Sequence, residues 1–164
     1  SNAIAIAWQV NCDGSKERHK MVNSRNKGSA YERSICQLFN LELGSQFNFK
    51  RDLEQYRSAD HGDIISDDPA WPFVVELKRY ASGPAGGQIA WWTQAVNAAT
   101  AAEKLPVLIY KYDRADPIAV IQKRTIARAL GEQSALNAHS IVRYWCEVPE
   151  FLTIAREVMA YDAA

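Results

Sequence analysis

The sequence is poor in the residues that build disulfide frameworks and zinc sites. Its 164 residues include only three cysteines and three histidines. The cysteines are odd in number, far apart and without a CxxC pair, and the histidines are equally scattered. Disulfide-stapled domains and sulfur- or imidazole-based metal sites need these residues in larger numbers or at close spacing. The sequence therefore argues against both classes and favours a reducing compartment.

Long apolar runs and net charge are also missing. No run of 18 or more apolar residues exists, so we expect no membrane span. The formal net charge is zero, and composition alone does not indicate a nucleic-acid partner. The charge is unevenly distributed, however, because the segment 16–33 holds six lysines and arginines against two acids. This segment is interpreted either as a solvated charged face or as a surface that contacts phosphates.

The length of the chain fits one domain with a substantial core. Ser1-Asn2-Ala3 is typical of a tag-cleavage remnant. We expect residues 1–23 to comprise this remnant and an N-terminal extension, and residues 24–164 to form a single domain.

Apolar spacing and turn residues predict an alternation of helices and strands. The predicted elements are a helix over 29–43, strands at 47–51, 62–65 and 73–78, a helix over 88–104, strands at 106–110 and 118–121, a helix over 123–130, a strand at 141–146 and a helix over 149–160. The strand–helix–strand passage across 73–110 implies at least one parallel pair of strands. The expected class is therefore α/β with a mixed central sheet flanked by helices.

A candidate catalytic triplet ends the apolar strand at 73–78. Side chains alternate along a strand, so Glu76 and Lys78 project to one face while Leu77 enters the core. A carboxylate can hold a divalent cation there, and an ammonium group can stabilise charge on an attacked phosphate. The triplet alone is weak evidence, because about one acid-x-Lys triplet is expected by chance in such a composition.

A second acid strengthens the pattern. Asp63 begins the preceding strand, and hairpin pairing would bring it close to Glu76. A few carboxylate ligands of this kind suit Mg²⁺ or Mn²⁺. Asp60 is a competing ligand, and His61 could move a proton, although a loop histidine beside an acid is more often incidental.

The ordered motifs KGxxYER (27–33), Arg51, GDI (62–64), VELK (75–78) and WxxQ (91–94) resemble the PD-(D/E)xK nucleases, and within them the archaeal Holliday junction resolvases and their phage-encoded relatives. The resemblance implies a restriction-endonuclease-like αβββαβ core. It also implies that Asp63 and Glu76 ligate the metal, that Glu32 reaches towards it, and that Lys78 positions or activates the attacking water. Gln94 matches a polar position that often supports this site.

The resemblance implies a metal-dependent DNA endonuclease that cuts branched DNA as a homodimer, in the cytoplasm of a bacterial or phage-infected host cell. Two alternatives stay open: a restriction- or repair-type nuclease acting on linear duplex, and a catalytically idle DNA-binding module of the same fold. The candidate nucleic-acid contacts are Arg25, Lys27, Arg33 and Arg51. Helical spacing puts Trp92 in the core, with Ile89 on the same face, whereas Trp91 is the better candidate for stacking on a base.

Overall fold

The computed structural model describes residues 14–53, 62–132 and 142–164, with side chains described from residue 26 onward. The elements in chain order are α1 (Gly14–Leu43), the 3-10 turn η1 (Ser45–Phe47), β1 (Lys50–Arg51), β2 (Ile64–Ile65), β3 (Phe73–Tyr80), α2 (Ile89–Ala101), β4 (Leu105–Tyr112), β5 (Ile118–Gln122), α3 (Lys123–Ala129), β6 (Arg143–Glu147) and α4 (Val148–Asp162). The predicted αβββαβ order from α1 to β4 is confirmed.

The strands form one mixed sheet in the order β1-β2-β3-β4-β5-β6. β3 and β4 are parallel and paired from Phe73 with Leu105 to Tyr80 with Tyr112, while the other neighbouring strands are antiparallel. The parallel pair that the sequence predicted around α2 is therefore confirmed. Its long register fixes β3, the strand that carries Glu76 and Lys78, in the middle of the sheet.

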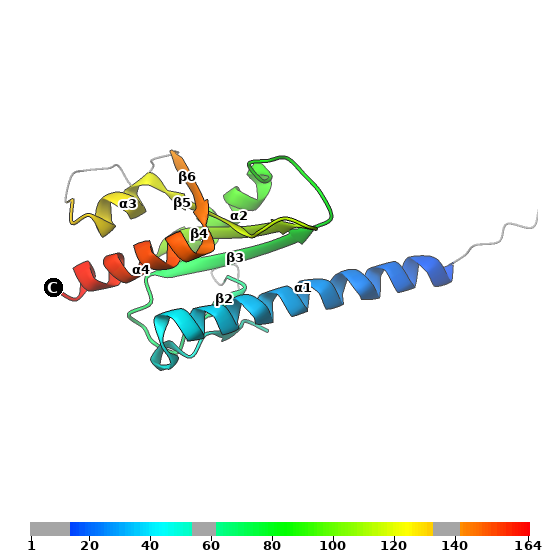
Figure 1. Ribbon diagram of the computed structural model, residues 1–164, viewed down its shortest axis with the longest axis horizontal. Helices are drawn as coiled ribbons and strands as arrows, with labels where there is room; N and C mark the ends of the chain where they lie inside the picture. The colour runs from blue at the N-terminus through cyan, green and yellow to red at the C-terminus, as the bar shows by residue number, and fades with distance from the viewer. Residues whose placement is uncertain (1–13, 54–61, 133–141) are drawn as a thin grey trace, which may run out of the picture.

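Helices cover both faces of the sheet (Figure 1). On one face, α1 and α4 pack on the main core, whose largest fully buried side chains include Phe39, Phe73 and Phe151. On the opposite face, α2 packs on β4 and β5 through residues such as Trp92 and Leu108. Burial of the strands on both faces explains why β3 and β4 read as continuous apolar runs.

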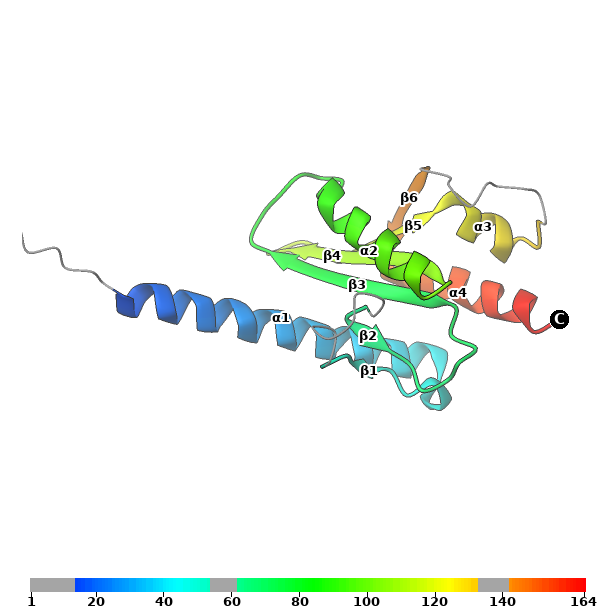
Figure 2. The same cartoon turned by 180° about the vertical axis from the view of Figure 1, so that it is seen from behind.

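The first helix begins earlier than the apolar spacing predicted, at Gly14 rather than at residue 29. Figure 2 shows that its N-terminal part extends past the strands, away from α4 and the C-terminus. Apolar periodicity detects only the part of a helix that packs on a core, and this explains the missed start. None of the described helices combines the length and the apolar character needed to cross a bilayer.

The predicted strand at 47–51 is wrong at its start, where the chain forms η1 instead. Asn48 has a left-handed backbone (φ 45°), which interrupts the alternation of a strand. Phe47 and Phe49 nevertheless both face the core, where their rings stack 5.5 Å apart beside Trp71.

The prediction for Trp91 is also wrong. Trp91 is buried and its ring stacks on Tyr80 at 4.8 Å, whereas Ile89 is 70% exposed. The aromatic side chains of β3 and β4 reach α2 and cover Trp91, which helical spacing alone could not show. Trp92 lies in the core, as predicted.

Candidate active site

Asp63 is fixed at the edge of β3, where the short strand β2 begins. Its backbone N–H donates to the Val75 carbonyl at 2.8 Å, and its carboxylate accepts the Leu77 N–H at 2.5 Å. A side chain at Gly62 would place a Cβ 2.4 Å from the Val75 carbonyl oxygen, so only glycine allows this close approach. The Gly-Asp pair of the motif thus places a carboxylate beside the Glu76–Lys78 segment.

Glu76 and Lys78 project to the α2 face of β3, while Leu77 enters the main core, as strand alternation predicted. Lys78 Nζ lies 2.7 Å from a Glu76 carboxylate oxygen. Gln94 of α2 completes a triangle, because its amide nitrogen donates to Glu76 at 2.7 Å and its carbonyl accepts from Lys78 at 3.1 Å. One amide therefore holds the acid and the base of the triplet in place.

Glu76 is buried, and its pKa departs from the usual value of a carboxyl group. Glu76 is only 2% exposed, and Asp63 is 7% exposed. The pKa of Glu76 is raised to about 7, by burial first and by the neighbouring Asp63 charge second, against the lowering effect of Lys78. A bound cation would relieve the repulsion between these two buried carboxylates.

Glu32 approaches this centre from α1 but is already engaged. It forms an ion pair with Arg51 of β1, and Arg51 also donates to the Ser29 hydroxyl at 3.2 Å. The Glu32 charge contributes to the raised pKa of Glu76, so the two groups feel each other. In the described part of the chain, however, no three His, Cys, Asp or Glu side chains are grouped closely enough to hold a metal ion.

The donor set still fits a hard divalent cation. Mg²⁺ is commonly held by one or two carboxylates, with water and substrate phosphate filling the other positions. Asp63 and Glu76 supply two buried carboxylates of this kind. Glu32 would be a third ligand only if it left Arg51.

The candidate DNA contacts are spread along α1 and β1. Lys27 and Arg33 are exposed, whereas Arg51 is half-buried in its ion pair with Glu32. The Arg25 side chain lies outside the described residues, as do Asp60 and His61.

Sequence reasoning missed several residues around the site. Ser29 supports Arg51, and its position three residues before Glu32 on one helix face was an available signal. Asp52 is buried, and its backbone N–H donates to the Asp63 carbonyl at 3.0 Å. Nothing in the local sequence distinguishes Asp52 from the other acids in the polar segment that it begins.

The segment that joins β3 to α2 is fastened by aromatic side chains. Tyr110 donates to the Ala85 carbonyl at 2.6 Å, Tyr112 to Pro84 at 2.8 Å and Trp145 to Gly86 at 3.1 Å. The glycines of this segment alone would favour mobility. These bonds instead attach the segment between β3 and α2 to β4 in the centre of the sheet and to β6 at its edge.

Comparison with known proteins places this site in a family. No curated protein matches the chain. A similar solved structure is the 1.6 Å structure of Archaeoglobus fulgidus Hjc, a Holliday junction resolvase from an archaeal hyperthermophile; it is 14% identical, with a TM-score of 0.46, and the match covers 80% of this chain and 98% of that chain.

A family model described as phage putative PDDEXK endonuclease matches residues 23–151. This range runs from α1 to the start of α4 and includes Glu32, Asp63, Glu76, Lys78 and Gln94. The chain therefore belongs to the phage PDDEXK endonuclease family, and it is a nuclease of the PD-(D/E)xK type.

Proposed function

We propose that the protein is a divalent-metal-dependent endodeoxyribonuclease that hydrolyses phosphodiester bonds, with selectivity for branched DNA. The observation that carries the metal-dependent chemistry is the pair of buried carboxylates, Asp63 and Glu76, beside a lysine held by Gln94. We further propose that it acts in the cytoplasm of a bacterial or phage-infected cell.

Mg²⁺ or Mn²⁺, when bound, supplies charge neutralisation at the scissile phosphate and acidifies a water ligand. Asp63 and Glu76 hold the ion, because they are the paired carboxylates of the site. Lys78 donates hydrogen bonds to the phosphate oxygens or to the attacking water and stabilises the negative charge that develops there. Gln94 positions both Glu76 and Lys78, so that neither group must reorganise during the reaction.

The choice of branched DNA rests on the motif resemblance described above, and linear duplex is the alternative substrate. A labelled four-way junction and a duplex of equal length should be incubated with the protein in Mg²⁺ and in EDTA. We expect cleavage of the junction well ahead of the duplex, in Mg²⁺ only. Equal cleavage of both substrates would reject the branched-DNA proposal and leave the nuclease site standing.

An idle DNA-binding module is a second alternative. It is disfavoured because Asp63, Glu76, Lys78 and Gln94 are all chemically competent and grouped around one centre. DNA binding with no cleavage in either Mg²⁺ or Mn²⁺ would favour it.

We also propose a homodimer, since paired incisions of a junction need two sites and two-fold symmetry supplies the second. Sedimentation should show a species of twice the chain mass. Lys27, Arg33 and Arg51, together with Arg25, are the proposed phosphate contacts. Removal of one such contact should reduce the log–log salt slope of binding by about 0.9 on duplex DNA. A monomer that cuts both strands without a preference for junctions would contradict the dimer proposal.

A further inference from the structure

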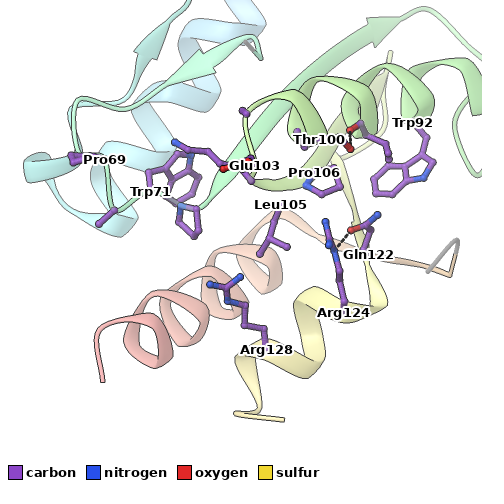
Figure 3. A pocket seen from close by; sticks show the side chains of 16 residues that line it. Pro69, Trp71, Trp92, Thr100, Glu103, Leu105, Pro106, Gln122, Arg124 and Arg128 are labelled. Carbon is purple, nitrogen blue, oxygen red and sulfur yellow. Dashed lines mark hydrogen bonds between the residues drawn. The ribbon is translucent and has the colours of Figure 1, made fainter. Parts of the chain in front are cut away.

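A second concave site lies between α2 and α3, and Figure 3 shows the residues that line it. Its cavity has a volume of about 830 Å³. The walls come from the turn before β3, from α2 and the turn that follows it, from the start of β4, from the end of β5 and from α3. None of the proposed catalytic residues lines it.

The geometry of α2 separates this cavity from the active site. Trp92 lines the cavity, while Gln94 contacts Glu76. Residues two positions apart on an α-helix differ by about 200° around its axis, so the Trp92 and Gln94 side chains leave α2 on nearly opposite sides. The sites are nevertheless close along the sheet, because Pro106 of the cavity pairs with Val74, two residues before Glu76.

Positive charge predominates in the lining, with Lys104, Arg124 and Arg128 against Glu103. Figure 3 shows Arg124 and Arg128 projecting from α3 towards the space below α2. Arg128 is neutralised by Asp162 at 2.7 Å. Among the described residues, neither Lys104 nor Arg124 has an ion-pair partner, and Arg124 donates a hydrogen bond to the neutral side chain of Gln122.

These cations are also partly removed from water. Burial lowers the pKa of Lys104, and burial together with the nearby Arg128 charge lowers the pKa of Arg124. Arg124 and Arg128 are one turn apart on α3 and face the same way, which keeps their charges close. An anion between α2 and α3 would relieve this repulsion.

A further unsatisfied donor belongs to the cavity wall. The Trp71 side chain is 1% exposed, and its indole N–H has no hydrogen-bond partner among the described residues. Buried donors are nearly always paired, so an unpaired one in a cavity wall indicates a missing acceptor. The cavity volume falls within the range of small-molecule sites, about 300–1,000 Å³, and is larger than a phosphate ion needs.

We propose that this cavity binds a nucleotide unit through its phosphate group, with Lys104 and Arg124 contacting the phosphate. The unit is either a free deoxynucleoside monophosphate or the phosphorylated end of a DNA strand. Only the strand-end source rests on the proposed DNA-cleaving function.

Binding should be measured by calorimetry on the full chain in EDTA. The probes are a deoxynucleoside monophosphate, the matching nucleoside and inorganic phosphate. The monophosphate should bind, and the nucleoside should bind at least about tenfold more weakly, because it lacks the charge-assisted hydrogen bonds. Lys104→Gln and Arg124→Gln should each weaken monophosphate binding about tenfold, while Glu103→Gln should strengthen it.

Lys123→Gln is the matched control, since Lys123 precedes Arg124 on α3, is exposed and does not line this cavity. Thermal midpoints of all variants verify folding. Asp63→Asn and Lys78→Ala should leave monophosphate binding unchanged, which separates this site from the catalytic centre. Monophosphate binding would therefore stand even if the protein did not cleave DNA, and DNA cleavage would stand even if the protein did not bind the monophosphate.

Oligonucleotides with and without a 5′-phosphate distinguish the two sources. Stronger binding of the phosphorylated strand than of the monophosphate, lost in Arg124→Gln, assigns a DNA end; preference for the monophosphate assigns a free nucleotide. Either of two results would overturn the proposal. One is that no phosphate-bearing probe binds. The other is that the probes bind Lys104→Gln and Arg124→Gln as tightly as they bind Lys123→Gln.

Discussion

At the scale of single residues, the site is organised around the contacts of Glu76. Its carboxylate is bonded by Lys78 and by Gln94, and the Gln94 amide can satisfy both partners only in the orientation that donates to Glu76 and accepts from Lys78. Lys78 keeps 20% of its side chain exposed, so it can also reach a substrate. These contacts assign different roles to neighbouring residues of one strand.

Lys78→Ala should lower the single-turnover cleavage rate by about 10²-fold, the scale for losing one group that stabilises developing charge. DNA affinity should change little, because one phosphate contact among many contributes little of it. Lys111→Ala is a suitable control, since Lys111 is a half-buried lysine on the neighbouring strand β4. A Lys78→Ala protein with normal rate and lost affinity would instead assign Lys78 to the DNA-binding surface.

The buried charge of Glu76 should also be visible in stability. Its pKa is raised from 4.5 to about 7 in the folded protein, by burial first and by Asp63 second. Between these values the folded state holds a proton that the unfolded state has lost, so the unfolding free energy falls as the pH rises. The loss is on the order of 3 kcal/mol and is complete above about pH 7.

Glu76→Gln removes this titration. In EDTA, urea unfolding of the wild type and the variant should be compared between pH 5 and pH 8. The stability difference should shift in favour of the variant as the pH rises, because all other titrating groups are common to both proteins. Parallel stability curves would contradict the assignment of a raised pKa to Glu76.

At the scale of elements, the contact between α1 and β1 controls the third acid. The ion pair of Glu32 with Arg51 holds the Glu32 carboxylate while Ser29 steadies the arginine. The pair is partly buried, with 18% of the Glu32 side chain and 25% of the Arg51 side chain exposed. The ion pair with Arg51 therefore restrains the Glu32 carboxylate of α1.

If Glu32 is a metal ligand, Glu32→Gln should weaken Mn²⁺ binding, and Arg51→Gln should strengthen it by releasing the carboxylate. Direct Mn²⁺ titration without DNA is the appropriate measurement, because Arg51 is also a proposed phosphate contact. If Glu32→Gln and Arg51→Gln change the Mn²⁺ affinity equally, and the double variant changes it no further, Glu32 serves only to hold Arg51.

At the scale of the whole molecule, the sequence predicts the order of elements well because most of them bury a regular apolar face. Strand alternation was sufficient to direct Glu76 and Lys78 to one side of β3, and the parallel pairing with β4 followed from the helix between them. The motif then predicted that Gln94 belongs near this pair. Local spacing and motif order carry all of this information.

Other features depend on contacts between distant segments, which local spacing does not contain. The ion pair of Glu32 with Arg51 joins positions on different elements. The burial of Trp91 depends on Tyr80 and on the aromatic side chains of β4. The second cavity likewise combines Trp71, Lys104 and Arg124, and no pattern along the chain connects these three residues.

The central claim is that Asp63 and Glu76 hold a divalent cation that the nuclease requires. The most direct measurement is single-turnover cleavage of a labelled four-way junction by the wild type, Asp63→Asn and the control Asp67→Asn, in which the altered carboxylate is exposed and paired with Lys50. We expect cleavage by the wild type and the control in Mg²⁺ and none in EDTA, with a loss of at least about 10²-fold in Asp63→Asn. Full activity of Asp63→Asn, or of the wild type in EDTA, would contradict the account.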